Sequence, residues 1–394
     1  MSLSLSALFC IFDRSSMSMA LNFNMQQKQS VKFINRDKSL FYQTVKENVN
    51  KYFTDNHISK FGNNTMYMKS FVLLTAYIGA FSLILIFNPP FIVSMLLWFT
   101  MGITVAGVGM SVMHDANHGA YADNKYVNMM MGYTLNLLGG TVHNWKLQHN
   151  ILHHTYTNIT GLDDDIDDKA GMRFSPHNTW KPKHNFQYVY AFFLYGLITL
   201  YWCIAKDFAQ FSKYTANGVN ANSRSANIIM FIKLIFLKAG YFFLFLVMPT
   251  MFFEIPFIQV LTGFLIMHFV GGMILSVVFQ LAHTVEGTSH PMPSTDGTIE
   301  NCWAIHQLNT TMNFSRKNKW LSWYVGGLNF QVEHHLFPKI CHVHYPEIAP
   351  IVKATAEQFN IPYLESKTFG SALQSHIKTL KRLGKMPVLD EIMG

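Results

Sequence analysis

Residues 70–118 read SFVLLTAYIGAFSLILIFNPPFIVSMLLWFTMGITVAGVGMSVMHDANH, and no charged residue occurs between Ser70 and Met113. Asn88, Pro89 and Pro90 divide the run into halves, each close to the roughly 20 apolar residues that a helix needs to cross a bilayer. Proline also disfavours a helical conformation for the residue before it. The pattern predicts a membrane-spanning helical hairpin, with spans of about 70–88 and 91–113.

A second apolar hairpin is predicted at about 228–253 and 257–282, with its turn at residues 254–256. Lys233 and Lys238 lie in its first helix, where long side chains are expected to extend towards the lipid headgroups. Both hairpin turns lack Lys and Arg, whereas the N-terminal arm, the centre and the C-terminal third hold most of the positive charge. The positive-inside rule then places both termini and the central region in the cytosol.

The overall composition agrees with a membrane protein. Half of the 394 residues are hydrophobic and 13% are charged, whereas soluble domains carry about 25% charged residues. The net charge of +8, in a chain with long apolar runs, favours anionic headgroups or an acidic protein partner over nucleic acid. The cysteines form no C-x-x-C pair, which argues against a disulfide framework or a thiolate metal site; they are Cys10, Cys203, Cys302 and Cys341.

Three histidine clusters lie just outside the apolar spans: HDANH at 114–118, HNILHH at 149–154 and QVEHH at 331–335. Histidines at i and i+4 share one face of a helix, and neutral imidazole binds first-row transition metals. Seven or eight convergent imidazoles exceed the usual ligand set of one zinc ion and favour two metal ions. The candidate ligands are His114, His118, His149, His153, His154, His334 and His335, with His283 at the end of the fourth span.

Other polar residues have weaker signals. For His306 a structural or ligand-orienting role is favoured, for His268 a buried hydrogen bond, and His143 has no assignment. Asp115 and Glu333 are open between orienting an imidazole and an unrelated role. The acidic residues Asp163–Asp165, Asp167 and Asp168 lack the glycine and glutamate of a calcium-binding EF-hand loop, so a solvated or ligand-orienting role is expected.

Two shorter apolar stretches, 127–142 and 188–205, are marginal for crossing a membrane. The histidine clusters can act together only if they lie on one side of the bilayer. Two hairpins satisfy this condition, whereas one extra crossing would separate the later clusters from the first. Both stretches are therefore expected to be interfacial or re-entrant.

The predicted organisation is an all-α integral membrane protein in which a cytosolic helical cap holds the metal site between two hairpins. Residues 1–65 are expected to form a polar, partly disordered arm whose start is a poor secretory signal. Residues 66–350 form the domain with the four spans and the clusters. Residues 351–394 form a cytosolic C-terminal tail.

The clusters resemble the boxes of the membrane fatty-acid desaturases, H-x-x-x-H, H-x-x-x-H-H and Q-x-x-H-H, in order and with two spans between the second and third. The strings HDANHGAY, HNILHHTYTN, TNITGLDDDID, FQLAH and FQVEHHLFP resemble the front-end branch of that family. In that branch a glutamine, here Gln331, replaces the first histidine of the third box. The resemblance covers about residues 65–350.

The resemblance implies a di-iron enzyme that uses O2 and two electrons to introduce a cis double bond into an acyl-CoA or acyl-lipid chain. Front-end enzymes place the bond between an existing double bond and the carboxyl end, which implies a linoleoyl-type substrate and delta-6 or delta-5 selectivity. Gln331 would contact a metal or a bound water. The implied iron ligands are His114, His118, His149, His153, His154, His283, His334 and His335.

One feature departs from many eukaryotic front-end desaturases, because no H-P-G-G haem motif of a fused cytochrome b5 domain occurs in the chain. The resemblance then implies a separate electron donor, either ferredoxin or free cytochrome b5. Both tend to be acidic, which suits a basic cytosolic face. A multi-pass protein of a bacterial inner membrane is expected, or of the endoplasmic reticulum if the source is eukaryotic.

Two alternative functions remain open. A membrane hydroxylase can use the same metal centre, and the ligand set does not separate the two reactions. A histidine-rich metal transporter would need polar ligands within the depth of the membrane. The clusters here lie at span ends, which disfavours transport.

Overall fold

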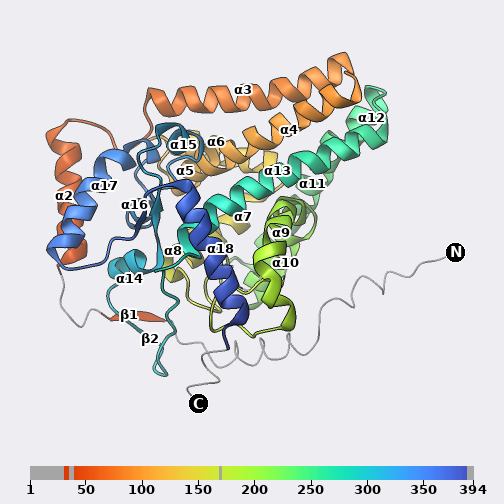
Figure 1. The fold of residues 1–394 in the computed structure, drawn as a ribbon. Coiled ribbons are helices and arrows are strands. Elements are labelled where there is room, and N and C mark those ends of the chain that lie inside the picture. Colours follow the sequence, from red (N-terminus) through yellow and green to blue (C-terminus); the bar gives the residue numbers. More distant parts are fainter. Residues whose placement is uncertain (1–30, 35–39, 168–170, 388–394) are drawn as a thin grey trace.

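The structure is a computed structural model in which residues 31–34, 40–167 and 171–387 are described. Figure 1 shows long helices that project from a compact group of shorter helices. Residues 1–30 and 35–39 of the arm that was expected to be partly disordered, together with Asp168, lie outside the described residues.

The first predicted hairpin is formed by α3 (Asn64–Phe87) and α4 (Phe91–Gly107). Asn88 ends α3 in a left-handed conformation, with φ of 38°, and the prolines then start the returning helix. α4 continues without a break through η2 (Val108–Val112) into α5 (Met113–His118). The same candidate membrane span, Phe91–His118, therefore carries the first histidine box at its end.

The second hairpin is formed by α11 (Arg224–Phe242), which continues as η7 (Phe243–Val247) and α12 (Met248–Phe252), and by α13 (Phe257–His283). α13 packs closely against α4 at Gly263. A Cβ atom there would lie 2.0 Å from the ring of Trp98, so the close approach requires glycine. In Figure 1 these helices extend in one direction from the rest of the molecule. The predicted hairpins thus match the long apolar helices.

A fifth helical segment, Pro182–Ala216, is also long and apolar enough to cross a membrane. The predicted 18-residue stretch was too short, because turns before and after it continue the helix. Its parts are η5 (Pro182–Phe186), α9 (Gln187–Tyr201), η6 (Trp202–Lys206) and α10 (Asp207–Ala216). α9 crosses α13 where a Cβ atom on Gly272 would lie 2.8 Å from the carbonyl of Gly196. The described residues therefore hold five candidate spans, one more than predicted.

A second group of helices packs around its own apolar core at the base of the hairpins. It consists of α2 (Phe41–Asp55), α14 (Trp303–Thr310), α16 (Gln331–Leu336) and α17 (Tyr345–Gln358). The expected polar arm therefore contains a helix. Its residues Phe41, Val45, Val49 and Phe53 recur every four positions and are buried in this core, as one face of an amphipathic helix requires.

Shorter elements complete the structure. The stretch 127–142 is divided between α6 (Lys125–Gly132), η3 (Tyr133–Leu138) and the start of α7 (Val142–Trp145). The expectation of an entirely helical chain missed two small parallel sheets. β1 (Lys32–Ile34) pairs with β2 (Thr298–Glu300), and β3 (Asn313–Phe314) pairs with β4 (Glu365–Ser366). The remaining helices of the described residues are η4 (Lys146–His153), α8 (His154–Tyr156), α15 (Lys319–Tyr324), η8 (His342–His344) and α18 (Phe369–Lys385).

The expectation for Lys238 was wrong. This side chain is buried, with 4% of its surface exposed, and does not extend to the headgroups. Its Nζ donates to a carboxylate oxygen of Asp207 at 2.6 Å and to the carbonyl of Trp202 at 2.9 Å. The ion pair with Asp207 takes the place of the water that would otherwise solvate the Lys238 ammonium group. Asp207 is 31 residues away in the sequence, so the residues around Lys238 do not indicate this pair. Lys233 is exposed, as expected.

Candidate metal centre

Segments far apart in the sequence bring eight histidine side chains together. The first box lies on α5, the second on η4 (Lys146–His153) and α8 (His154–Tyr156), and the third on α16. The last residue of α13 contributes His283. All eight candidate ligands are buried: His114, His118, His149, His153, His154, His283, His334 and His335.

The imidazoles form two groups. The first contains His114, His118, His149 and His334, and the second contains His153, His283 and His335; within each, the candidate ligand atoms lie within 4.8 Å of one another. The ring centroid of His154 lies 4.6 Å from that of His334 and 4.5 Å from that of His335. His154 thus contacts both groups, an arrangement that fits two neighbouring metal ions.

The second box departs from the expected geometry. Helical i,i+4 spacing predicts that His149 and His153 aim at one point, but each belongs to a different group of imidazoles, and the set of candidate ligand atoms that includes both is completed by Asp165. The reason is that η4 is a π-helix, whose wider turn rotates successive side chains differently from an α-helix. The first box behaves as expected, since His114 and His118 share a group.

The histidine cluster fits metal ions chemically. The Nε2 atoms of His118, His154, His334 and His335 are buried and have no hydrogen-bond partner among the described residues. Buried polar atoms are normally satisfied, and a metal ion would satisfy several of these atoms at once. Burial, with neighbouring imidazoles, holds the pKa of His154, His334 and His335 well below 6.5. Neutral imidazole is the form that binds metals.

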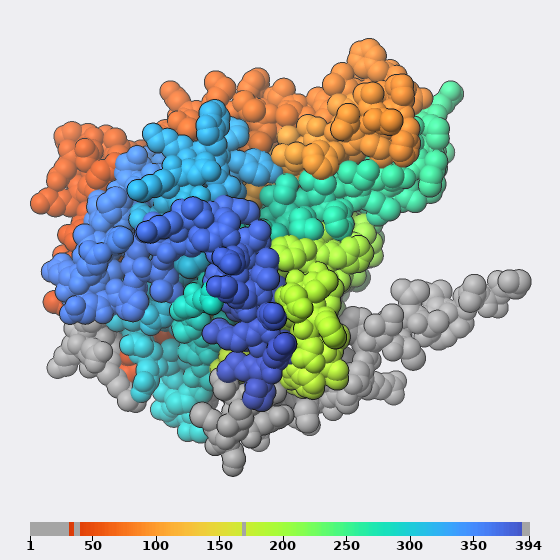
Figure 2. Space-filling model, in the orientation of Figure 1, coloured from red at the N-terminus to blue at the C-terminus, as the bar shows by residue number. Residues whose placement is uncertain are grey.

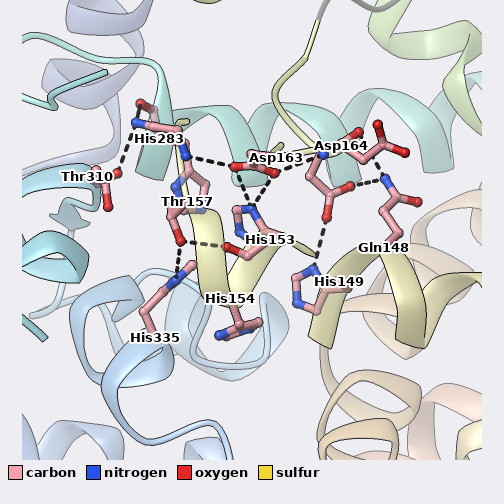
Figure 3. A network of polar contacts seen from close by, with 12 residues as sticks. Gln148, His149, His153, His154, Thr157, Asp163, Asp164, His283, Thr310 and His335 are labelled. Carbon is pink, nitrogen blue, oxygen red and sulfur yellow. Dashed lines mark hydrogen bonds and ion pairs between the residues drawn. The ribbon is translucent and has the colours of Figure 1, made fainter. Parts of the chain in front are cut away.

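The acidic run after the second box orients two of these imidazoles (Figure 3). Asp163 is buried and accepts from Nδ1 of His153 at 3.0 Å, and Asp165 accepts from Nδ1 of His149 at 3.2 Å. Hydrogen bonding at one ring nitrogen leaves the other nitrogen to act as the ligand. Of the two roles expected for the run, these contacts support the orienting one.

Two further orienting residues were missed in the sequence. The side-chain oxygen of Gln307 accepts from Nδ1 of His335 at 2.8 Å. The hydroxyl of Tyr345 lies 3.2 Å from Nδ1 of His334. Glutamine and tyrosine are common polar residues, and neither stands in a box, so no local signal distinguished them.

Asp115 and Glu333, whose roles were open, both contact other partners. Asp115 accepts from Nδ1 of His342 at 2.7 Å, while its other oxygen lies 3.7 Å from Nδ1 of His114. Glu333 accepts from the Asn313 amide and the Tyr363 hydroxyl, both at 2.7 Å. Asp115 therefore lies beside a candidate ligand, whereas Glu333 connects α16 to β3 and to the segment before β4.

The histidines outside the boxes have structural contacts. His268 hydrogen-bonds the Tyr241 hydroxyl and the Thr199 hydroxyl, each at 3.1 Å, which confirms the buried hydrogen bond expected for it. The ring of His306 packs against Phe33 at 5.0 Å. Neither His306 nor the half-buried His143 belongs to either group of candidate ligands.

A mainly apolar cavity of about 170 Å³ adjoins the first group. Its wall is formed mainly by α9, α13 and η2, and it reaches His114, His149 and His334. Gln331 also lines the cavity, and its buried side-chain oxygen has no hydrogen-bond partner among the described residues. The cavity therefore places an apolar space beside three of the imidazoles.

Comparison with known proteins agrees with this site. The model of the Fatty acid desaturase family matches residues 55–367. The chain is 34% identical over 348 residues to the sn-1 linoleoyl-lipid 6-desaturase of Arthrospira platensis, covering 88% of this chain and 93% of the relative. It is 33% identical over 366 residues to the protein of the same name from Synechocystis sp., covering 92% and 99%.

A relative from a plant extends the likeness beyond these two. The chain is 32% identical over 361 residues to the acyl-lipid (8-3)-desaturase of Physcomitrium patens, covering 91% of this chain and 74% of the relative. The family match and these identities confirm the resemblance that the histidine boxes indicated. This chain belongs to the fatty acid desaturase family.

Proposed function

We propose that this chain is a front-end acyl-lipid desaturase. It introduces a cis double bond between an existing double bond and the carboxyl end of a lipid-bound acyl chain. The observation that carries the proposal is the apolar cavity that ends at His114, His149 and His334. The relatives named for linoleoyl-lipid and acyl-lipid substrates favour a lipid over an acyl-CoA.

The eight buried histidines are proposed to hold two iron ions. When bound, the irons would supply the oxidising power of O2, which would take two electrons from a donor and two hydrogens from adjacent methylenes and, with two protons, leave as two water molecules. The protein's own part is to position these methylenes and to keep water away. The apolar wall stabilises the acyl chain by burial, and Gln331 places a polar side chain where the cavity meets the metal site.

We propose that the chain crosses the membrane four times, with the metal centre on the cytosolic side. The contacts of the fifth apolar segment support this topology. Near its start, Gln187 accepts from the amide of Arg173 at 2.8 Å, and near its end, Tyr214 donates to Asp164 at 2.5 Å. Both partners lie in the segment after the second box. A helix that crossed the bilayer would have its ends on opposite sides, so this segment is proposed to be interfacial or re-entrant.

The electrons are proposed to come from a separate acidic protein, ferredoxin or cytochrome b5, that binds the basic cytosolic face. Attraction between exposed charges weakens with ionic strength. Turnover should therefore fall with added salt when the donor is limiting. A rate that does not change with salt would argue against electrostatic binding of the donor.

Expression in a host that is fed linoleate tests the proposal. Gas chromatography with mass spectrometry of the lipids should detect a new double bond on the carboxyl side of the existing ones. A hydroxy acid without a new double bond would instead establish the hydroxylase alternative. Comparison of linoleoyl-phospholipid with linoleoyl-CoA in isolated membranes separates the two substrate classes. His334→Ala should insert into the membrane at the normal level but form no product.

A further inference from the structure

The C-terminal segment, expected to be a simple tail, forms a helix that binds the wall of the cavity. Figures 1 and 2 show α18 lying beside α9, between the apolar helices and the helix group that contains α14, α16 and α17. Ser375 accepts from the amide of Glu286 at 2.8 Å, and the guanidinium of Arg173 donates to the carbonyl of Leu383 at 2.7 Å. α18 is therefore fixed near its middle to the segment that follows α13, and near its C-terminal end to the segment that follows the second box.

His376, on the buried face of α18, bonds at both ring nitrogens. Nδ1 lies 2.7 Å from the carbonyl of Thr284, and Nε2 lies 2.8 Å from the hydroxyl of Tyr195. A carbonyl can only accept, so Nδ1 carries the proton and Nε2 accepts from Tyr195. Burial lowers the pKa of His376 to about 4, which keeps the imidazole in this neutral form.

The two hydrogen-bond partners of His376 lie at the wall of the cavity and at the end of α13. The Tyr195 side chain lines the cavity, and its ring stacks on those of Phe174 and His376, with centroid distances of 6.5 and 6.0 Å. Thr284 directly follows His283, at the end of α13. His376 therefore links the wall of the cavity to the helix end that presents a candidate metal ligand.

We propose that His376 is a positioning residue for the acyl chain. By holding Tyr195 at a fixed place relative to the metal centre, it helps to determine which methylenes lie beside the histidine cluster. This inference rests on the proposed desaturase function, because it concerns the fit of the acyl chain in the same cavity. The sequence contains no local signal for it, since Tyr195 and His376 are 181 residues apart.

Three variants separate the two hydrogen bonds of His376. Asn places its amide where Nδ1 lies, so H376N retains the bond to Thr284 and loses the bond to Tyr195. Gln extends to the position of Nε2, so H376Q retains the bond to Tyr195. Y195F removes the hydroxyl and leaves the ring. The full-length proteins are expressed in the linoleate-fed host, and double-bond position, chain-length ratio and iron content are measured.

We expect H376N and Y195F to change the ratio of positional or chain-length products by about three- to ten-fold, the size expected for one lost hydrogen bond. H376Q should retain the wild-type ratio. Y190F, on the same helix, is the matched control, since Tyr190 donates to the carbonyl of Gly171 and lies outside the cavity wall. Iron content should stay normal throughout.

Two results would overturn the inference. One is a wild-type product ratio in H376N and Y195F, and the other is a loss of iron in parallel with activity, which would indicate a purely structural role. Y195F decides the question if the His376 variants fail to accumulate. Failure of the wild-type protein to desaturate would instead refute the proposed function, so the two failures are distinguishable.

Discussion

The two carboxylate oxygens of Asp163 each lie 3.0 Å from Nδ1 of His153. The same carboxylate accepts from the backbone amides of Asn158 at 2.8 Å and Asp165 at 3.0 Å. These bonds fix the carboxylate, and the carboxylate fixes the imidazole. Nε2 is then the nitrogen of His153 that would bind a metal beside His283 and His335.

Asp163→Asn should weaken iron binding by about 10- to 100-fold, the usual effect of losing a hydrogen bond that orients a ligand. Titration of the metal-free protein with Fe2+ measures this change. Asp167→Asn is a control in the same loop, since Asp167 accepts from the amide of Gly161 at 3.2 Å. Equal iron affinity in Asp163→Asn and the wild type would show that Asp163 does not orient a ligand.

His283→Ala should lower the iron content of the purified protein from about two ions per chain to about one. His283 belongs to the smaller group with His153 and His335, while the first group stays complete. His268→Gln, on the same helix, should retain both irons because His268 bonds to Tyr241 and Thr199. Retention of two irons by His283→Ala would exclude His283 as a required ligand.

The long helices could be predicted because their signals are local. A charge-free run and a pair of prolines are enough to specify α3 and α4. The histidine boxes can be recognised because their histidines lie close together in the sequence. The extent of the fifth helix was harder to predict. Its central 188–205 stretch is apolar, but residues such as Lys206 and Asp207 interrupt the pattern, and their burial depends on neighbouring helices.

The residues that orient the imidazoles could not be predicted from sequence. Gln307 and His335 are 28 residues apart, and Thr157 and His335, whose side chains lie 3.3 Å apart, are separated by 178 residues. Such pairs depend on how helices pack, which composition and periodicity do not encode. The grouping of the second box failed for another reason. Sequence spacing does not show whether a helix has α or π geometry, and the two rotate successive side chains differently.

Lys238→Met should destabilise the protein by about 3–5 kcal/mol, because it leaves the Asp207 carboxylate buried without its cation. Asp207 is fully buried and also accepts from Thr141 at 3.0 Å. The effect is measured as the change in the free energy of unfolding in detergent, monitored by the amount of folded protein that remains. The double variant Lys238→Met/Asp207→Asn should recover much of the loss, since it removes both charges. A double variant less stable than Lys238→Met would contradict this account of the pair.

Acidification should destabilise the metal-free protein below pH 6.5. Burial lowers the pKa of His290, His306 and His376 to about 4, whereas histidine in an unfolded chain titrates near 6.5. The unfolded state therefore binds more protons as the pH falls from about 6.5 towards 4, and stability falls with it. Each histidine contributes up to about 1.4 kcal/mol per pH unit in this window.

His306→Gln isolates one share of that pH dependence without touching the candidate ligands. The slope of unfolding free energy against pH, measured from pH 7 to 5 on metal-free protein, should decrease by up to about 1.4 kcal/mol per pH unit. Above about pH 7.5, one unit beyond the pKa of histidine in the unfolded chain, the slopes of the variant and the wild type should coincide, because His306 is almost entirely neutral in both states there. An unchanged slope below pH 6.5 would mean that His306 gains its proton in the folded protein as readily as in the unfolded chain.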